Sequence, residues 1–278
     1  MDTTGSSGGA DGWDAPRLQA ALAQRQGWGP VVLLESTGST NADASDAARA
    51  GAAEGYVIVA DEQTLGRGRL GRSWATPPGA GLAVSVVLRP PITPERAGWL
   101  PLLVGIAVVD ALRGHSVPAA LKWPNDVVVA GPTRDGGPGP RKLGGLLAER
   151  VQEADAVVVG IGLNIALRAD ELPVETATST SIEGATVSRE DLLVDLLDGL
   201  RERYLAWVAA GGDPAACGLL EDYRSRCLTL GRQVRAHLPG GDVLEGRATD
   251  VDDSGRLRIE APGRDAVLVA AGDVEHLR

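Results

Sequence analysis

Residues 66–72, with the sequence GRGRLGR, alternate three glycines with three arginines in a chain whose formal net charge is −10. Glycine lets a backbone approach a ligand closely, and a guanidinium binds carboxylates and phosphates through two parallel hydrogen bonds. A flexible basic linker would have the same composition, so the rest of the chain must decide between a linker and a ligand-binding loop. Taken with the acidic balance of the protein, the segment predicts a site that holds a small anion.

The same seven residues also fit the G-x-G-x-x-G fingerprint of dinucleotide-binding folds. That fingerprint needs a helix directly after the glycines and an acidic residue about 20 positions further on. The next residues here are SWATPP (73–78), and two prolines cannot extend a helix. Pro91 stands where the acidic residue would be expected. A dinucleotide-binding fold is therefore excluded.

Length and composition limit the class of protein. The 278 residues suffice for one large domain, or for one large domain and a small companion. A net charge of −10 argues against nucleic-acid binding, which needs a basic face. The sequence has neither an apolar run of ~20 residues nor a signal peptide. We expect a cytoplasmic protein that binds neither nucleic acid nor membranes.

Apolar periodicity and turn residues predict mixed α and β structure up to about residue 227. The predicted strands cover 31–35, 56–61, 81–88, 120–123, 126–129, 142–149 and 156–164. The predicted helices cover 16–26, 40–50, 94–114, a segment that starts at 188, and 214–226. Thr40 and Asn41 are expected to cap the second helix. The Gly/Pro-rich residues 131–141 predict a mobile hairpin loop.

The sequence changes character after Cys227. Short β-type runs are separated there by Gly-Gly, Asp-Asp-Ser-Gly and Pro-Gly turns. Five short strands in about 50 residues predict a small barrel.

Four further motifs accompany the arginine segment. They are STN (39–41), KWPND (122–126), KLGGLL (142–147) and GIGLN (160–164). In order and content these motifs closely resemble the biotin protein ligases, which join biotin to a lysine of carboxylase carrier domains. The resemblance covers roughly residues 31–278. Where that family can show a basic residue between the second arginine and the third glycine, this chain has Leu70.

The resemblance implies an α+β catalytic domain related to the class II aminoacyl-tRNA synthetases, with a mixed sheet and helices, followed by an SH3-like β-barrel. We expect a disordered tail and a short helix in residues 1–28, the catalytic domain in 29–227 and the barrel in 228–278. The implied reaction uses ATP with Mg²⁺ to make an adenylate of biotin and then transfers biotin to the carrier domain. Oligomeric state, monomer or homodimer, is left open.

Positive charge is what such a reaction needs, because two anions meet and charge grows on the phosphoryl oxygens. The candidates for this charge are Arg67, Arg69 and Lys142, and the chemistry of the second step adds Asp126 as a catalytic candidate. By the resemblance, Lys142 would bridge the biotin carboxylate and the α-phosphate. Asp126 would orient the acceptor lysine and help to remove its proton.

Biotin has an apolar chain and a polar ureido head, so its pocket needs apolar walls and a few directed hydrogen-bonding groups. The resemblance implies these biotin-binding residues: Ser39, Thr40, Asn41, Gln63, Arg67, Gly68, Arg69, Lys142, Gly145 and Gly160. Simpler roles remain open for some of them. Residues 39–41 would also serve as a helix cap, and the glycines at 144, 145 and 160 as bulges or tight-packing positions.

The nucleotide is assigned a second, overlapping set. The implied ATP-binding residues are Arg69, Arg72, Trp74, Lys122, Asn125, Lys142 and Asn164. Trp74 would stack on adenine, with a place in the core as the alternative. Lys122 would meet phosphate or pair with Asp126, and Arg72 would reach the departing phosphates or face solvent. The arginine segment is expected to be disordered without ligand and to close over the adenylate.

Three other functions compete with a biotin ligase. A lipoate–protein ligase uses related architecture and the same adenylate chemistry, but the arginine segment and KWPND fit the biotin enzymes better. A biotin-responsive repressor would need a winged helix-turn-helix, and only about 30 residues precede the first catalytic strand. A non-catalytic biotin-binding module would not need Lys142.

Overall fold

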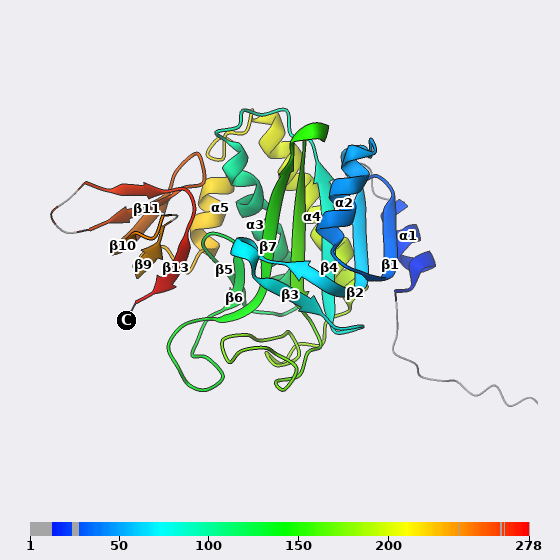
Figure 1. Cartoon of the computed structure of the whole chain (residues 1–278), viewed down its shortest axis with the longest axis horizontal. Helices are drawn as coiled ribbons and strands as arrows, with labels where there is room; N and C mark the ends of the chain where they lie inside the picture. Colours follow the sequence, from blue (N-terminus) through cyan, green and yellow to red (C-terminus); the bar gives the residue numbers. More distant parts are fainter. Residues whose placement is uncertain (1–12, 24–27, 239, 262, 264, 278) are drawn as a thin grey trace, which may run out of the picture.

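The computed structural model describes residues 13–23, 28–238, 240–261, 263 and 265–277. A large mixed β-sheet forms the centre of the first part of the chain (Figure 1). Its strands are β1 (Val31–Thr37), β2 (Val57–Arg67), β3 (Ser73–Thr76), β4 (Gly81–Leu88), β5 (Ala119–Lys122), β6 (Asp126–Val129), β7 (Arg141–Val151) and β8 (Ala156–Asn164). The order across the sheet is β1-β2-β4-β8-β7-β6-β5, with β3 paired to β2. β1 pairs with β2 in parallel, and the other neighbours pair antiparallel.

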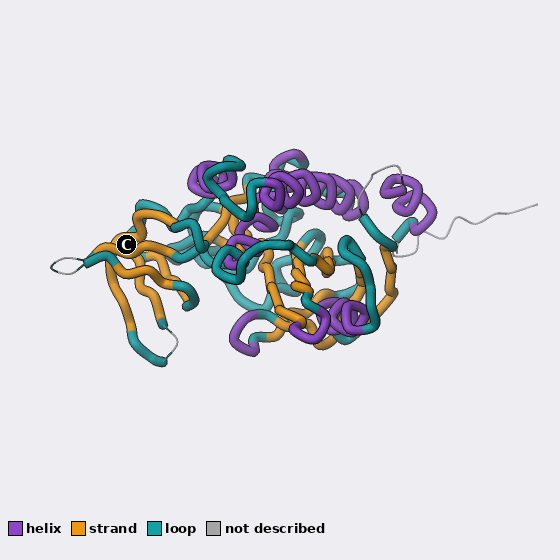
Figure 2. The backbone as a smooth tube through the Cα atoms, turned by 90° about the horizontal axis from the view of Figure 1, so that it is seen from above, coloured by secondary structure: helices purple, strands orange, loops and turns teal. Residues whose placement is uncertain are grey.

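Helices cover both faces of this sheet (Figure 2). They are α1 (Ala15–Ala23), α2 (Thr40–Arg49), α3 (Leu100–Gly114), α4 (Arg189–Ala209) and α5 (Leu219–Arg226), with 3₁₀ turns at Arg69–Gly71, Ala97–Trp99 and Gln152–Ala154. α2 packs on β2, β4 and β8, while α3 packs on β5–β7 and against α4 and α5. Every residue of β4 is buried because it has a helix layer on each side.

The two faces of β4 explain its sequence, GLAVSVVL. Its even-numbered apolar residues, 82–88, join the main core with α3 and α4. Its odd-numbered residues face α2, where Val87 packs with Ala44 and Ala48 in a smaller core. Alanine on α2 lets this helix lie close to the sheet, which places its N-terminal residues beside β4 and β8. Packing thus positions the STN motif at one wall of a pocket.

A second sheet is built entirely after residue 227. Its strands are β9 (Gln233–His237), β10 (Val243–Val251), β11 (Leu257–Glu260), β12 (Val267–Val269) and β13 (Asp273–His276), in the antiparallel order β12-β11-β10-β9-β13. The five predicted strands are therefore present, in agreement with an SH3-like unit. The α+β class predicted for the whole chain is confirmed. The domain limits at 28/29 and 227/228 stay a prediction.

Two tryptophans join the second sheet to the first part of the chain. Trp99 Nε1 donates to the Asp252 carbonyl at 3.0 Å, and Trp123 Nε1 donates to the Gly255 carbonyl at 3.1 Å. Both indoles are almost completely buried, and residues of both sheets belong to one continuous core. The turn between β10 and β11 is therefore fixed against the first part of the chain.

Several predicted boundaries were wrong. The helix predicted for 214–226 begins at Leu219, because Gly218 adopts a left-handed φ of 80° before it. The helix predicted for 94–114 is α-helical only from Leu100. The strand predicted to end at Asp61 continues to Arg67, since β3 pairs with its second half. The first helix was expected to reach residue 26, but residues 24–27, like the predicted tail over 1–12, lie outside the described residues.

One described segment, Ala97–Gly114, is long and apolar enough to cross a membrane by length and composition. Most of it is buried, and its helix α3 lies between the sheet and α4 and α5. The apolar residues all round this helix are explained by burial on all sides in the core.

Candidate active site

A cavity of about 720 Å³ opens beside the ends of β2, β6, β7 and β8. Its lining comes from the N-terminus of α2, the β2–β3 hairpin, the turn before β6, strands β7 and β8, residues 167–177 and β13. This volume is within the range of small-molecule sites. Every residue that the sequence predicts for the biotin and ATP sites lines this cavity. Their individual roles stay predictions.

The arginine segment forms the turn of the β2–β3 hairpin. Gly66 and Arg67 are the last residues of β2, and the Gly68 amide donates to the Arg72 carbonyl at 2.6 Å to close the turn. Gly66 is required by close packing, because a Cβ there would lie 2.0 Å from Gln63 Nε2. The expected loop is therefore partly strand in this structure.

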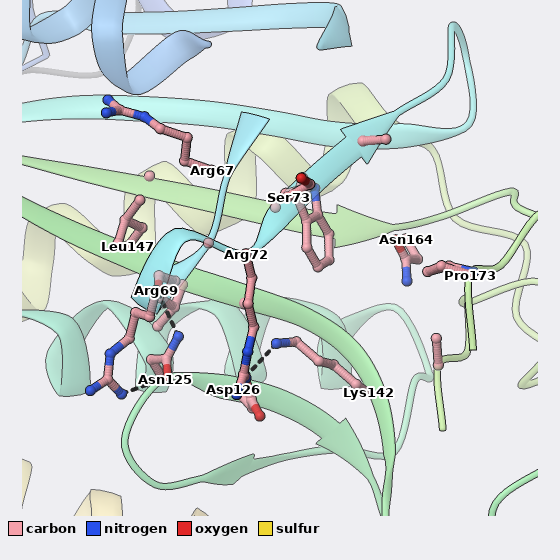
Figure 3. A pocket seen from close by; sticks show the side chains of 18 of the residues that line it. Arg67, Arg69, Arg72, Ser73, Asn125, Asp126, Lys142, Leu147, Asn164 and Pro173 are labelled. Atoms are coloured by element: carbon pink, nitrogen blue, oxygen red, sulfur yellow. Dashed lines mark hydrogen bonds and ion pairs between the residues drawn. The ribbon is translucent and has the colours of Figure 1, made fainter. Parts of the chain in front are cut away.

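Two cations from separate elements meet one dipeptide at the floor of the cavity (Figure 3). Arg69 Nη1 donates to Asn125 Oδ1 at 3.0 Å, and Lys142 Nζ lies 2.6 Å from Asp126 Oδ1. Lys122 Nζ approaches the other oxygen of the same carboxylate at 3.7 Å. Asn125 and Asp126 thus bring the arginine segment and Lys142 to the same space.

The Arg69 guanidinium at the floor of the cavity is partly buried. Burial lowers the pKa of Arg69, and the carboxylates of Asp273 and Asp126 oppose the shift. A guanidinium nevertheless remains charged at neutral pH. A half-buried cation that water screens poorly attracts an anion more strongly than a fully exposed one.

Lysine is almost absent from this protein. Of its 27 basic residues only Lys122 and Lys142 are lysines, and both contact Asp126. All the other residues of this basic set are arginines, including those that form exposed ion pairs. An ammonium is a compact charge on a flexible stem, which suits contact with a moving phosphoryl oxygen.

One end of the cavity is a buried polar cluster below α2. Gln63 Oε1 accepts from the Thr40 amide at 2.9 Å and from its hydroxyl at 3.0 Å, so Gln63 caps the helix. Ser39 holds the N-cap position but makes no side-chain cap bond. The predicted cap by Thr40 and Asn41 was therefore wrong. A side chain from β2 fills that role because the parallel β1–β2 pair places it at the helix N-terminus.

Asn41 extends this cluster toward β7. Its amide donates to the Leu147 carbonyl at 3.2 Å and to Glu149 Oε2 at 2.7 Å, and Arg67 Nη2 lies 3.5 Å from the same carboxylate. Ser85 Oγ lies within hydrogen-bond distance of Thr40 Oγ1 and Asn41 Oδ1. Fixed donors and acceptors of this kind can recognise a polar ring.

Glycines of β7 and β8 at or next to the cavity have different structural roles, and Gly145 and Gly160 line it while Gly144 does not. A Cβ on Gly160 would lie 2.2 Å from Asn41 Oδ1, and one on Gly144 would lie 2.4 Å from the Leu163 side chain. These two positions accommodate side chains of the protein itself. A Cβ on Gly145 would make ordinary contacts, the nearest 3.4 Å from Lys142 Nζ. Tight packing therefore explains Gly144 and Gly160, while a side chain at Gly145 would meet only ordinary van der Waals contacts.

The other end of the cavity contains Trp74, Asn164 and residues 167–177. In Figure 3, Asn164 and Pro173 lie opposite Arg67 and Leu147. The Trp74 ring fills the space above Gly162, where a Cβ would lie 2.6 Å from it. Trp74 Nε1 is buried without a partner in the described part of the chain, and Lys142 Nζ lies 5.9 Å from the ring centroid. Trp74 thus has a ring face in the pocket and an unused donor.

β13 forms part of the rim. Asp273, Val274 and Glu275 line the cavity, and Asp273 pairs with Arg72. Arg72 therefore contacts the C-terminal sheet in this structure, although its side chain is still largely exposed.

Sequence reasoning missed Ser85, Glu149, Asp273 and the lining residues of the segment 167–177. Ser85 is the one polar residue in an otherwise apolar strand, which was a usable signal. The presence of only two lysines in the sequence was another usable signal, because both line the cavity. Nothing local marks Glu149, Asp273 or residues 167–177, because only tertiary contacts bring them to the cavity.

Known proteins resemble this chain over nearly its whole length. The model of the biotin/lipoate A/B protein ligase family matches residues 13–165, and that of the biotin protein ligase C-terminal domain matches residues 229–277. A biotin–[acetyl-CoA-carboxylase] ligase of Mycobacterium tuberculosis is 41% identical, over 95% of this chain and 99% of that protein. A bifunctional ligase/repressor of Bacillus spizizenii is 34% identical, over 83% of this chain and 69% of that protein.

A solved structure agrees with these sequence matches. The biotin protein ligase of Aquifex aeolicus, solved in complex with biotin and ATP, has a TM-score of 0.73 and 27% identity. The match covers 90% of this chain and all of that one.

Proposed function

Because the chain belongs to the biotin/lipoate A/B protein ligase family, we propose that its cavity is the active site of a biotin–protein ligase. The enzyme activates biotin with ATP and transfers it to a lysine of a carboxylase biotin carrier domain. The reaction needs two steps, since a carboxylate does not acylate an amine in water without activation.

In the first step, an oxygen of the biotin carboxylate attacks the α-phosphorus of ATP. The bond to pyrophosphate breaks, and biotinyl-AMP remains. We assign Arg67, Arg69 and Lys142 to the charge that develops on the phosphoryl oxygens, because fixed cations at that point need no rearrangement. Asp126 holds Lys142 in place at 2.6 Å.

In the second step, the neutral ε-amine of the carrier lysine attacks the acyl carbon and AMP leaves. Asp126 is our candidate to orient that amine and accept its proton. Its carboxylate is engaged with Lys142 and Lys122 before ligand binding. Movement of Lys142 toward the phosphate would free an oxygen of Asp126 for the incoming amine.

One observation carries the proposal: Asn125 and Asp126, adjacent in the chain, hold Arg69 and Lys142 at the floor of a single cavity. A polar cluster lies at one end of that cavity and an indole face at the other. We assign the first end to the ureido head of biotin and the second to adenine, with the cations between them.

Mg²⁺ is expected to enter on the phosphates of ATP. Among the described residues, no group of three or more His, Cys, Asp or Glu side chains could hold a metal ion. Mg²⁺ is commonly bound by one or two carboxylates together with substrate phosphates. We further propose that the enzyme works in the cytoplasm without binding DNA, in line with its net charge of −10.

Mass spectrometry of a carrier domain tests the proposal. The carrier is incubated with this protein, ATP, Mg²⁺ and biotin, and we expect the mass of one biotinyl group to appear on one lysine. Omission of ATP should abolish the product. Lipoate in place of biotin should leave the carrier unmodified; transfer of lipoate and not biotin would contradict the assignment.

A further inference from the structure

We infer that Arg134, in the loop between β6 and β7, is a positioning residue that builds the nucleotide end of the cavity. It does so by holding residues 169–177 in place. In the described part of the chain, the side-chain partners of Arg134 are Ala169, Val174, Glu175 and Ala177, none of which is assigned to biotin or to the phosphates. The inference rests on the proposed function, because that function places adenine at this end.

Arg134 binds three carbonyl groups of one segment. Its Nε donates to Ala177, its Nη1 to Ala169 and its Nη2 to Val174, each at 3.0 Å. Only 14% of the side chain is exposed. Glu175 lies 3.6 Å away and pairs with the same guanidinium. One side chain therefore satisfies carbonyls spread over nine residues of irregular backbone.

The held segment is a wall of the cavity. Its lining residues are Glu171, Pro173, Val174, Thr176 and Ala177. The backbone next to it is tied directly to a catalytic candidate, since the Lys142 amide donates to the Thr176 carbonyl at 2.6 Å and the Thr178 amide donates to the Lys142 carbonyl at 2.8 Å. Between 165 and 176 the segment has no helix or strand to stabilise it.

The loop that carries Arg134 is itself built for rigidity. The Thr133 amide donates to the Gly137 carbonyl at 2.9 Å, and Asp135 Oδ1 accepts from the Thr133 hydroxyl at 2.5 Å and from the Gly137 amide at 3.2 Å. This turn presents the guanidinium toward the wall. The Gly/Pro-rich loop, predicted from sequence only as mobile, thus acquires a role.

Arginine is needed for this contact. Its planar fork places five N–H donors in fixed directions, whereas a lysine ammonium is a point charge that cannot reach three separated carbonyls at once. Loss of the fork would remove three hydrogen bonds from the segment and free the wall to move, although the Val174 carbonyl would keep the bond that the Ala177 amide donates at 3.0 Å. The polar cluster below α2 lies at the other end of the cavity, and the side-chain hydrogen bonds of Thr40, Asn41 and Gln63 connect α2 with β2, β4 and β7.

Steady-state kinetics of the full chain test the inference. We expect Arg134→Ala to raise the KM for ATP about tenfold, to leave the KM for biotin within about twofold and to change Tm little. Arg134→Lys should stay several-fold above the wild type in KM for ATP. Full recovery with lysine, or an equal rise of both KM values, would overturn the inference.

Two matched variants, at residues of this region that do not line the cavity, serve as controls. Arg168→Ala removes an arginine of the same region that makes only exposed pairs with Asp170 and Glu171. Glu175→Gln removes the ion pair to Arg134 but keeps the carbonyl bonds. Both variants should have the KM values of the wild type for ATP and for biotin. An Arg134→Ala enzyme with the same KM values as these controls would refute the inference about Arg134 and leave the proposed function untouched. A wild-type enzyme that forms no biotinyl-AMP would refute the proposed function instead.

Discussion

At the scale of single residues, the site depends on one carboxylate between two ammonium groups. Asp126 keeps Lys142 extended into the cavity and also lies near Lys122. Replacement of Lys142 leaves the carboxylate of Asp126, whose side chain is 20% exposed, with Lys122 at 3.7 Å, so this charge keeps a partner. The effect of Lys142 on catalysis can therefore be separated from effects on folding.

We expect Lys142→Ala to reduce biotin-dependent pyrophosphate exchange by about 10²–10³-fold, as for the loss of a fixed charge at a developing anion. Arg150→Ala is the control, because this exposed residue lies on the same strand and pairs only with Asp155. An exchange rate in Lys142→Ala close to that of the control would show that Lys142 does not stabilise the developing charge, and no exchange by the wild type would show a binding module instead of an enzyme.

The two glycines of the cavity should differ sharply when a methyl group is added. Gly160→Ala would push against Asn41 and disturb the cluster assigned to biotin, whereas Gly145→Ala meets only ordinary contacts. We expect a KM for biotin raised at least about tenfold in Gly160→Ala, and within about threefold of wild type in Gly145→Ala. Titration of biotin in the exchange assay measures both, and equal values would contradict the packing difference.

At the scale of elements, the β2–β3 hairpin is the part with least support. Leu70 at its tip has a left-handed φ of 56° and is 73% exposed. That conformation costs a non-glycine residue roughly 1–2 kcal/mol, and no burial of the side chain offsets it. Arg67 and Arg72 are tied down by single exposed ion pairs, which contribute little.

We therefore expect trypsin to cleave within residues 67–72 in the free enzyme and to be blocked by biotin together with ATP. Closure of the hairpin over the adenylate is the physical reason. Peptide mapping of the digest follows the cleavage. Lys142→Ala, which should form no adenylate, is the control that stays sensitive; protection of that variant to the same degree would contradict closure over the adenylate.

At the scale of the whole molecule, the C-terminal sheet and the active site share one core. Trp123 precedes Asn125 and Asp126 and is held by Gly255 and by the Thr229 hydroxyl, which lies 3.0 Å from its amide. His276 on β13 lies 3.1 Å from the same hydroxyl. The position of the catalytic turn thus depends on the second sheet.

The partly buried contact of His276 with Thr229 predicts that the stability of the protein depends on pH. Burial lowers the pKa of His276 to about 4, and the charges of Lys122 and Arg232 add to the shift. Near pH 5 the unfolded chain binds a proton that the folded chain does not, so this group contributes stability above pH 6.5 that is lost as the pH falls toward 4. Allowing for partial exposure, the loss between pH 7.5 and 5 is roughly 1–2 kcal/mol.

Urea unfolding at the two pH values measures this contribution. His276→Gln keeps a hydrogen-bonding group but cannot titrate. Between pH 7.5 and 5 this variant should therefore lose roughly 1–2 kcal/mol less stability than the wild type. Identical losses in both proteins would show that His276 is not responsible.

The sequence by itself determined the residue types and the local elements. The apolar runs located β4, β6 and β8, and Ser188 located the start of α4, because strand and helix patterns depend on near neighbours in the chain. The motifs at 39–41, 66–72, 122–126, 142–147 and 160–164 gave the residues that gather in the cavity.

Only the tertiary structure decided which side chains meet. Gln63 caps α2 across 23 residues, Arg134 holds carbonyls more than 30 residues away, and Arg72 meets Asp273 across about 200 residues. The order of strands in the sheet and the packing of the second sheet set these contacts. No local pattern encodes them, because a hydrogen-bond partner is selected by proximity after the chain has folded.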